Sequence, residues 1–402
     1  MGKVMLLKAI VVLLPIQPVF AQECKTNADL DLMPGKYLTA AQYPWPAVKA
    51  EYFNKMTTAT DKAMAKQVLG NLEKAEQQSR NGFTLTGGSW ESYYSTEGYR
   101  YFGNARLGTY TFQTALYEFF CSKGRPVRNS EYSTVLRVYV NALPVNTMNR
   151  FLNNPYGSSI GEYDFNLQYM DWKNHKLTEP YDALITLFTY MSCANEQLIQ
   201  TINSGNDYFQ DTPAKDIRVN SYNHIYRYWF VKKNNLPVLL PVSRREYLNS
   251  LLEYYEREKL YFPKLIAKLT KENDKGVARY NHWERDVSDK IAIVEKAISG
   301  NNEEWLKAQA IINRVEDASL TYKAKLEEKT NNNRFWRFYG SDNKSEPLYQ
   351  YNPEYFKASA PNQAKPQFVL IAFRYSTMPS SLRLLDNFTN NFDFDAVKKM
   401  MQ

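Results

Sequence analysis

The chain has 402 residues and a formal charge of +8, with 44% hydrophobic and 23% charged residues. This length supports one large domain, or two or three smaller ones, with a sizeable core. Basic pairs such as Lys232-Lys233 and Arg244-Arg245 are dispersed along the chain, as on a solvated surface, so we expect no nucleic-acid partner.

The first 21 residues have the pattern of a signal peptide. Lys3 and Lys8 precede an uncharged stretch of 13 residues, which ends with Val19-Phe20-Ala21 at the expected cleavage site. A transmembrane helix needs about 20 apolar residues, so this stretch is too short for a retained anchor. We therefore predict an exported protein (periplasmic, surface-bound or secreted) that has no transmembrane anchor once residues 1–21 are removed. The alternative is a buried N-terminal helix.

The three cysteines, Cys24, Cys121 and Cys193, allow at most one intramolecular disulfide and leave at least one thiol. No pair has the spacing of metal ligands, and the sequence does not select a bonded pair. Cys121 and Cys193 lie among aromatic residues, where small buried apolar side chains are also expected.

Residues 22–220 are predicted to form a mixed region of helices and strands. A helix is expected at about 60–80, where apolar residues recur at helical spacing. Residues 83–142 alternate in the manner of strands, and we predict an antiparallel hairpin with a long loop. A helix over 109–123 is the alternative, because its aromatic residues also fit one helical face.

The second half of this region has a less regular spacing of apolar residues. Residues 143–177 are expected to form a long irregular connection, since they are rich in Pro, Gly and Asn. A helix is predicted to begin at Thr178-Glu179-Pro180 and to end at Ser204-Gly205. The polar residues 206–220 are predicted to be a linker.

Residues 221–402 are predicted to form a second region. A β-hairpin is expected over 222–242, with Asn234-Asn235 in the turn and the return strand at a sheet edge because of Pro237 and Pro241. A strand at 367–375 and a helix from Pro379 are expected near the end of the chain.

An extended antiparallel helical unit is predicted between them, near 243–329. Ser243 and Glu246 have the spacing of a capping box at its start. Three amphipathic helices are expected, with breaks near Gly276 and Gly300 and a kink or break at Pro263. The predicted fold class is α+β, with antiparallel hairpins packed against helices and this helical unit attached.

Catalytic motifs are sparse. Gly157-Ser158-Ser159-Ile160-Gly161 matches the G-x-S-x-G string of serine hydrolases, but it lacks the preceding apolar strand and the following helical pattern. Ser159 is therefore a weak candidate nucleophile, and an extracytoplasmic hydrolase, using Ser159 or an unidentified carboxylate pair, is an alternative function. His175, His224 and His282 lack the spacing of metal ligands, so we expect neither a metal nor a cofactor.

Aromatic residues make up 15% of the chain and cluster at two places. The candidate binding residues are Trp90, Tyr93, Tyr94, Tyr99 and Tyr101 in one cluster and Trp336 in the other. Such side chains bind sugar rings, peptides and protein surfaces through flat apolar faces with polar edges. They also fill protein cores, which is the commoner use.

The sequence thus predicts an exported, non-catalytic binding protein that uses aromatic surface residues. Its partner would be a glycan, a peptide or an envelope protein. A structural or assembly protein of the cell envelope is a further alternative. It would require an exposed apolar stripe along Trp305, Ile312, Val315 and Tyr322.

Overall fold

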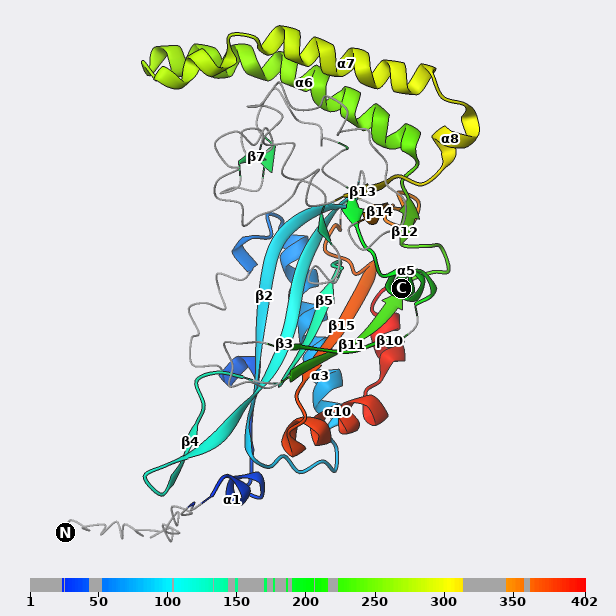
Figure 1. Ribbon diagram of the computed structural model, residues 1–402. Helices are drawn as coiled ribbons and strands as arrows, with labels where there is room; N and C mark the ends of the chain where they lie inside the picture. The colour runs from blue at the N-terminus through cyan, green and yellow to red at the C-terminus, as the bar shows by residue number, and fades with distance from the viewer. Residues whose placement is uncertain are drawn as a thin grey trace, which may run out of the picture.

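A computed structural model describes residues 24, 26–42, 53–102, 105–132, 134–143, 149–150, 170–171, 176–177, 186, 190–205, 207–215, 223–313, 345–357 and 362–402. Within these residues the largest sheet has eight strands (Figure 1). Its strands are β1 (Lys36–Leu38), β2 (Gly88–Phe102), β3 (Ala105–Ser122), β4 (Arg125–Arg128), β5 (Thr134–Val140), β10 (Asp207–Lys215), β11 (Asn223–Lys232) and β15 (Phe368–Tyr375). The order across the sheet is β1-β2-β3-β5-β15-β11-β10, and β4 also pairs with β3. Every pair is antiparallel except β1–β2.

Three helices lie on one face of this sheet: α3 (Ala59–Ser79), α10 (Pro379–Asn391) and α11 (Phe394–Lys399) (Figure 1). The strands alternate between two faces with period two, so every second side chain points to these helices. In β5, Leu136 and Val138 belong to the core under α3, whereas Arg137 and Tyr139 are only half-buried. This alternation separates an apolar face from a polar and aromatic face.

A second sheet packs beside one end of that other face. Its strands are β6 (Asn149–Arg150), β9 (Met191–Ser192), β12 (Leu239–Pro241), β13 (Ile311–Asn313) and β14 (Ser345–Tyr351), and the pair β7 (Met170–Asp171) and β8 (Lys176–Leu177) stands apart. Tyr351 and Phe356 pack with Phe102 of β2 and with Leu370 of β15 in one core. The helix α5 (Glu196–Ser204) joins this core and ends at Gly205, which has a φ of 78°, a conformation that glycine adopts readily.

A helical hairpin occupies one end of the molecule (Figure 1). It consists of α6 (Arg244–Lys271), the turn η3 (Lys275–Tyr280), α7 (Trp283–Ser299) and the short helix α8 (Glu303–Lys307). At its start the backbone amide of Ser243 donates to Glu246 Oε2 over 2.7 Å, and the Glu246 amide donates to Ser243 Oγ over 3.2 Å. This is the predicted capping box.

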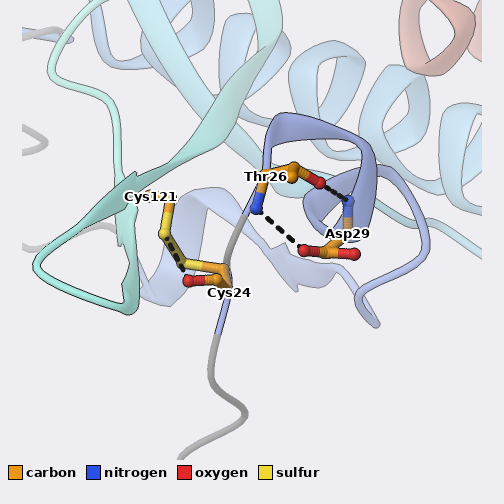
Figure 2. The surroundings of a disulfide bond; sticks show 4 residues. All are labelled: Cys24, Thr26, Asp29 and Cys121. Atoms are coloured by element: carbon orange, nitrogen blue, oxygen red, sulfur yellow. Dashed lines mark hydrogen bonds between the residues drawn. A yellow bond between two sulfur atoms is a disulfide. The ribbon is translucent and has the colours of Figure 1, made fainter.

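The opposite end carries α1 (Asn27–Asp31) and the projecting β3–β4 hairpin (Figure 1), and the short helix η1 (Ala40–Gln42) follows β1 beside β2. Cys24 and Cys121 form a disulfide that ties the start of the described chain to β3, and Thr26 caps α1 beside it (Figure 2). Cys193 is a buried thiol outside the disulfide, and burial raises its pKa to about 11. The prediction of at most one bridge is confirmed.

The structure confirms the α+β class and several elements of the prediction. The helix expected at 60–80 is α3, and the strands expected in 83–142 are β2, β3, β4 and β5. The alternative helix over 109–123 is wrong, because that segment pairs with β2 on one side and β5 on the other. The expected strand and helix near the end of the chain are β15 and α10. No helix within the described ranges is both long enough and apolar enough to cross a bilayer.

The predicted hairpin over 222–242 is wrong. Both strands exist, but β11 pairs with β10 and β15 in the large sheet, whereas β12 pairs with β14 in the second sheet. The return strand does lie at an edge, as its prolines indicate. The predicted linker is also wrong over 207–215, which form β10, an edge strand whose polar composition suits an edge.

Two predicted helices are wrong over part of their length. The helix expected over 178–205 is wrong at Met191-Ser192, which pair with β14, and α5 begins after the cap Asn195; residues 178–185 and 187–189 lie outside the described part of the chain. The third helix of the unit near 243–329 is present as α8 at its start but is wrong at Ile311–Asn313, which pair with β14, and residues 314–329 lie outside the described part of the chain. The helix α6 continues through Pro263 without a break.

Candidate functional site

The helix α3 presents three buried carboxyl groups to the sheet, and the aromatic residues of β2 bind them. The indole nitrogen Nε1 of Trp90 donates to Glu76 Oε1 over 2.8 Å, and the Tyr99 hydroxyl donates to Asp61 Oδ2 over 2.7 Å. Tyr94 donates from its hydroxyl to the carboxylate of Glu73. These bonds fix the helix against the sheet and leave the aromatic side chains in structural roles.

Burial raises the pKa of Glu76, although Arg80, at 2.9 Å from its Oε1, acts in the opposite direction. Asp61 Oδ1 accepts from the backbone amide of Ala364 over 3.0 Å, and Glu73 Oε1 accepts from that of Ala40 over 2.7 Å. The carboxylate oxygens of Asp61 and Glu73 thus bind α3 to the neighbouring backbone. Over the described part of the chain, His, Cys, Asp and Glu form no group that could hold a metal ion.

The opposite face of the large sheet carries a different set of side chains, which we call the tyrosine–arginine face. Its residues are Tyr93, Gln113, Tyr132, Arg137, Tyr139, Tyr226 and Arg374. The strand register brings them together from five segments of the chain. Tyr93 lies opposite Gln113, Gln113 opposite Arg137, and Arg374 opposite Tyr226.

Arg137 is at the centre of this face. Its Nε donates to Gln113 Oε1 over 2.7 Å and its Nη2 donates to the Tyr132 hydroxyl over 2.9 Å. Burial acts to lower the pKa of Arg137, but Tyr139, Tyr132, Tyr93 and Tyr226 act to raise it, and the pKa is raised overall. The guanidinium therefore stays charged, and all four tyrosines are near enough to interact with it electrostatically.

Arg374 approaches the same tyrosine from the neighbouring strand. Its Nη2 donates to the backbone carbonyl of Tyr132 over 2.8 Å, and its guanidinium lies 5.2 Å from the ring of that residue. Arg137 is 6.0 Å from the same ring. Tyr132 is thus held between two arginines, and Tyr117 packs edge-on against it with ring centroids 5.6 Å apart.

The far side of the face is an aromatic row on β11. The rings of Tyr226 and Tyr228 are stacked at 5.9 Å with an angle of 12° between their planes. Phe230 continues the row at 6.3 Å from Tyr228. Tyr226 is half-buried at one end of the row, whereas Tyr228 and Phe230 belong to the core that the second sheet covers. Burial raises the pKa of Tyr139, which lies across the sheet from this row.

The predicted binding residues divide between the two faces. Tyr93 lies on the tyrosine–arginine face, but Tyr94 lies on the α3 side, as adjacent residues of a strand must. Trp90 is 2% exposed and Tyr99 is also buried, so neither contributes to an exposed aromatic surface. Tyr101 lies in β2, but its side chain is outside the described part of the structure, as is Trp336.

Other sequence candidates are not brought into this site. Ser159 and the rest of its motif lie outside the described residues, and so do His175, Val315 and Tyr322. The apolar stripe proposed for the third helix is not helical at Ile312, which lies in β13, and Trp305 is half-buried in α8. His282 precedes α7 and is exposed.

Sequence reasoning missed most of the tyrosine–arginine face. Arg137, Tyr139 and Arg374 each occupy a position in a strand whose neighbours on both sides are apolar or aromatic core residues, and Tyr226 alternates with Ile225 and Arg227. A charged or hydroxyl-bearing side chain at every second position was the available signal. It shows that a strand has a second, polar face, but not which strands are neighbours.

Comparison of the chain with protein-family models, with curated proteins and with solved structures finds no match.

Proposed function

We propose that the protein is an exported binding protein whose ligand lies on the tyrosine–arginine face. The observation that carries the proposal is the environment of Arg137, a charged guanidinium surrounded by four tyrosines on the face of the sheet that lacks helices α3, α10 and α11. Tyrosine rings offer flat apolar surfaces, and their hydroxyl groups exchange hydrogen bonds at the edge.

The chemistry of these groups supports recognition and not proton transfer. An arginine remains protonated at any physiological pH, and the raised pKa of Tyr139 keeps its hydroxyl protonated as well. Such groups donate hydrogen bonds without changing their charge. A general base, in contrast, needs a pKa near the working pH.

Two observations support export. The N-terminal residues have the charge and hydrophobicity pattern of a signal peptide, and a disulfide joins Cys24 to Cys121. Disulfides persist mainly in oxidising compartments. Mass spectrometry of the chain recovered from its native cell tests this part of the proposal. We expect a mature chain that begins at Gln22, and an intact residue 1 would contradict it.

Two adjacent tyrosines offer a matched test of the binding face. The purified chain is screened against arrays of glycans and peptides, and Tyr93→Ala is then compared with Tyr94→Ala for any ligand found. Because the two side chains point to opposite faces, we expect Tyr93→Ala to weaken binding about 10-fold or more. The Tyr94→Ala protein should lose stability but retain its affinity. Equal affinity losses in both variants, or no ligand in the screen, would refute the proposal.

A further inference from the structure

The tyrosine–arginine face has two positive charges without a counter-charge. Arg137 and Arg374 lie on the neighbouring strands β5 and β15, where Arg137 is opposite Ala372, so the two arginines are diagonal neighbours. Diagonal neighbours in a sheet are about 7–8 Å apart. Within the described part of the chain neither guanidinium forms an ion pair with a carboxylate.

Two acidic residues of strand β2, Glu91 and Glu97, already have partners. Both oxygens of Glu91 accept from Arg128, which lies beside Tyr117, over 2.6 and 2.7 Å. Glu97, which is close enough to act on the pKa of Tyr139, pairs with Arg100. The charges of Arg137 and Arg374 are therefore not neutralised by these carboxylates. Partly buried charges without a partner are costly, and proteins usually pair them.

Hydrogen-bond donors on the same face are also unsatisfied. Gln113 is 4% exposed, and its Nε2 has no hydrogen-bond partner while its Oε1 accepts from Arg137. The Nε of Arg374 is buried and equally without a partner. Since buried donors are nearly always bonded, these two groups call for an acceptor.

We infer that the ligand of this face is an acidic sugar, whose anionic group lies between Arg137 and Arg374 and whose ring packs against the tyrosines. The planar fork of arginine matches a carboxylate or a sulfate, and both groups occur on sugar rings. This inference rests on the proposed function, because it names the class of ligand for the same face.

The first experiment uses the unaltered mature chain, so it does not depend on the folding of a variant. Isothermal titration calorimetry compares tetragalacturonate, its methyl ester, which keeps the ring but loses the charge, and a sulfated oligosaccharide of similar length. We expect one of the two anionic ligands to bind at least about 10-fold more tightly than the ester, the ratio expected for one charge-assisted hydrogen bond. The preferred anion distinguishes carboxylate from sulfate.

The second experiment tests whether Arg137 and Arg374 are the residues that bind the anionic group. Arg137→Gln and Arg374→Gln should each lower the affinity for the anionic ligand by about 10- to 100-fold and leave the weak affinity for the ester unchanged. Arg227→Gln is the matched control. Arg227 is in β11 next to Tyr226, but it is paired with Asp207, at 2.5 Å, so its loss should not change the affinity. The far-ultraviolet circular dichroism of each variant checks that it is folded.

The outcomes separate the inference from the proposed function. Equal binding of the ester and the acid, with loss in Tyr93→Ala, would overturn the acidic-sugar inference and leave the binding face intact. Binding of the acid that Arg137→Gln does not weaken would also overturn the inference. Failure of all three ligands to bind would overturn the inference alone, because the screen of glycans and peptides tests the face independently.

Discussion

Removal of the Asp61 carboxylate tests the account of how α3 is held on the sheet. This side chain is 1% exposed, and its two oxygens accept from the Tyr99 hydroxyl and from the backbone amide of Ala364. Asp61→Ala leaves both buried donors unsatisfied. Since a hydrogen bond to a charged group contributes about 1.5–3 kcal/mol, we expect a loss of about 3–6 kcal/mol in the free energy of unfolding.

Urea denaturation of the purified mature chain measures this loss. Asp61→Asn keeps one acceptor oxygen and should lose about half as much. Tyr99→Phe removes one partner, so the double variant with Asp61→Ala should be less destabilised than the sum of the single variants. A loss below about 1 kcal/mol in Asp61→Ala would refute the reasoning, because it would mean that water or other groups satisfy both donors.

Three further predictions concern stability and a fourth concerns the accessibility of a thiol. Replacement of Cys24 and Cys121 by Ser should cost about 4–5 kcal/mol by the loop-entropy model, because the disulfide closes a separation of 97 residues, and urea denaturation measures it. A thiol titration should find only Cys193, and only after unfolding, since this cysteine is buried. Ser243→Ala should lower stability by about 1 kcal/mol, because it removes the cap of α6, and a thermal melt should show the decrease. The raised pKa of Glu76 means that the folded state holds this proton more tightly than the unfolded state, so its contribution is present at acidic pH and is lost as the pH rises through the folded-state pKa. Glu76→Gln should flatten the stability profile over that range, and an unchanged profile would contradict the assignment.

Local pattern was sufficient for the elements of the fold that depend on neighbouring residues. The capping box at Ser243, the end of α5 at Gly205 and the alternation in β5 all arise from interactions within a few residues. The pairing of β11 was predicted incorrectly. One of its partners, β10, precedes it in the chain, but the other, β15, lies far from it in sequence, and no local pattern indicates which distant strand will pair with it. The same reason explains the wrong prediction at Ile312. Its spacing from other apolar residues fits a helix, but the residue pairs with β14 as a strand.

The candidate site was predicted only in part. The sequence identified Tyr93 from the density of aromatic residues, but the same density includes Trp90 and Tyr99, which lie in the core with carboxyl groups of α3. Aromatic content alone cannot distinguish these roles, because both use a flat ring with a polar edge. Arg137 and Arg374 are separated by more than half of the chain, and only the pairing of β5 with β15 makes them neighbours.

The most direct test of the central claim is a nuclear magnetic resonance titration of the arginine Nε–Hε signals with an acidic oligosaccharide that binds. The account predicts that the signals of Arg137 and Arg374 shift with the ligand, and that the signal of Arg227, which is paired with Asp207, does not. Shifts confined to arginines outside the tyrosine–arginine face would contradict the claim that this face binds the ligand.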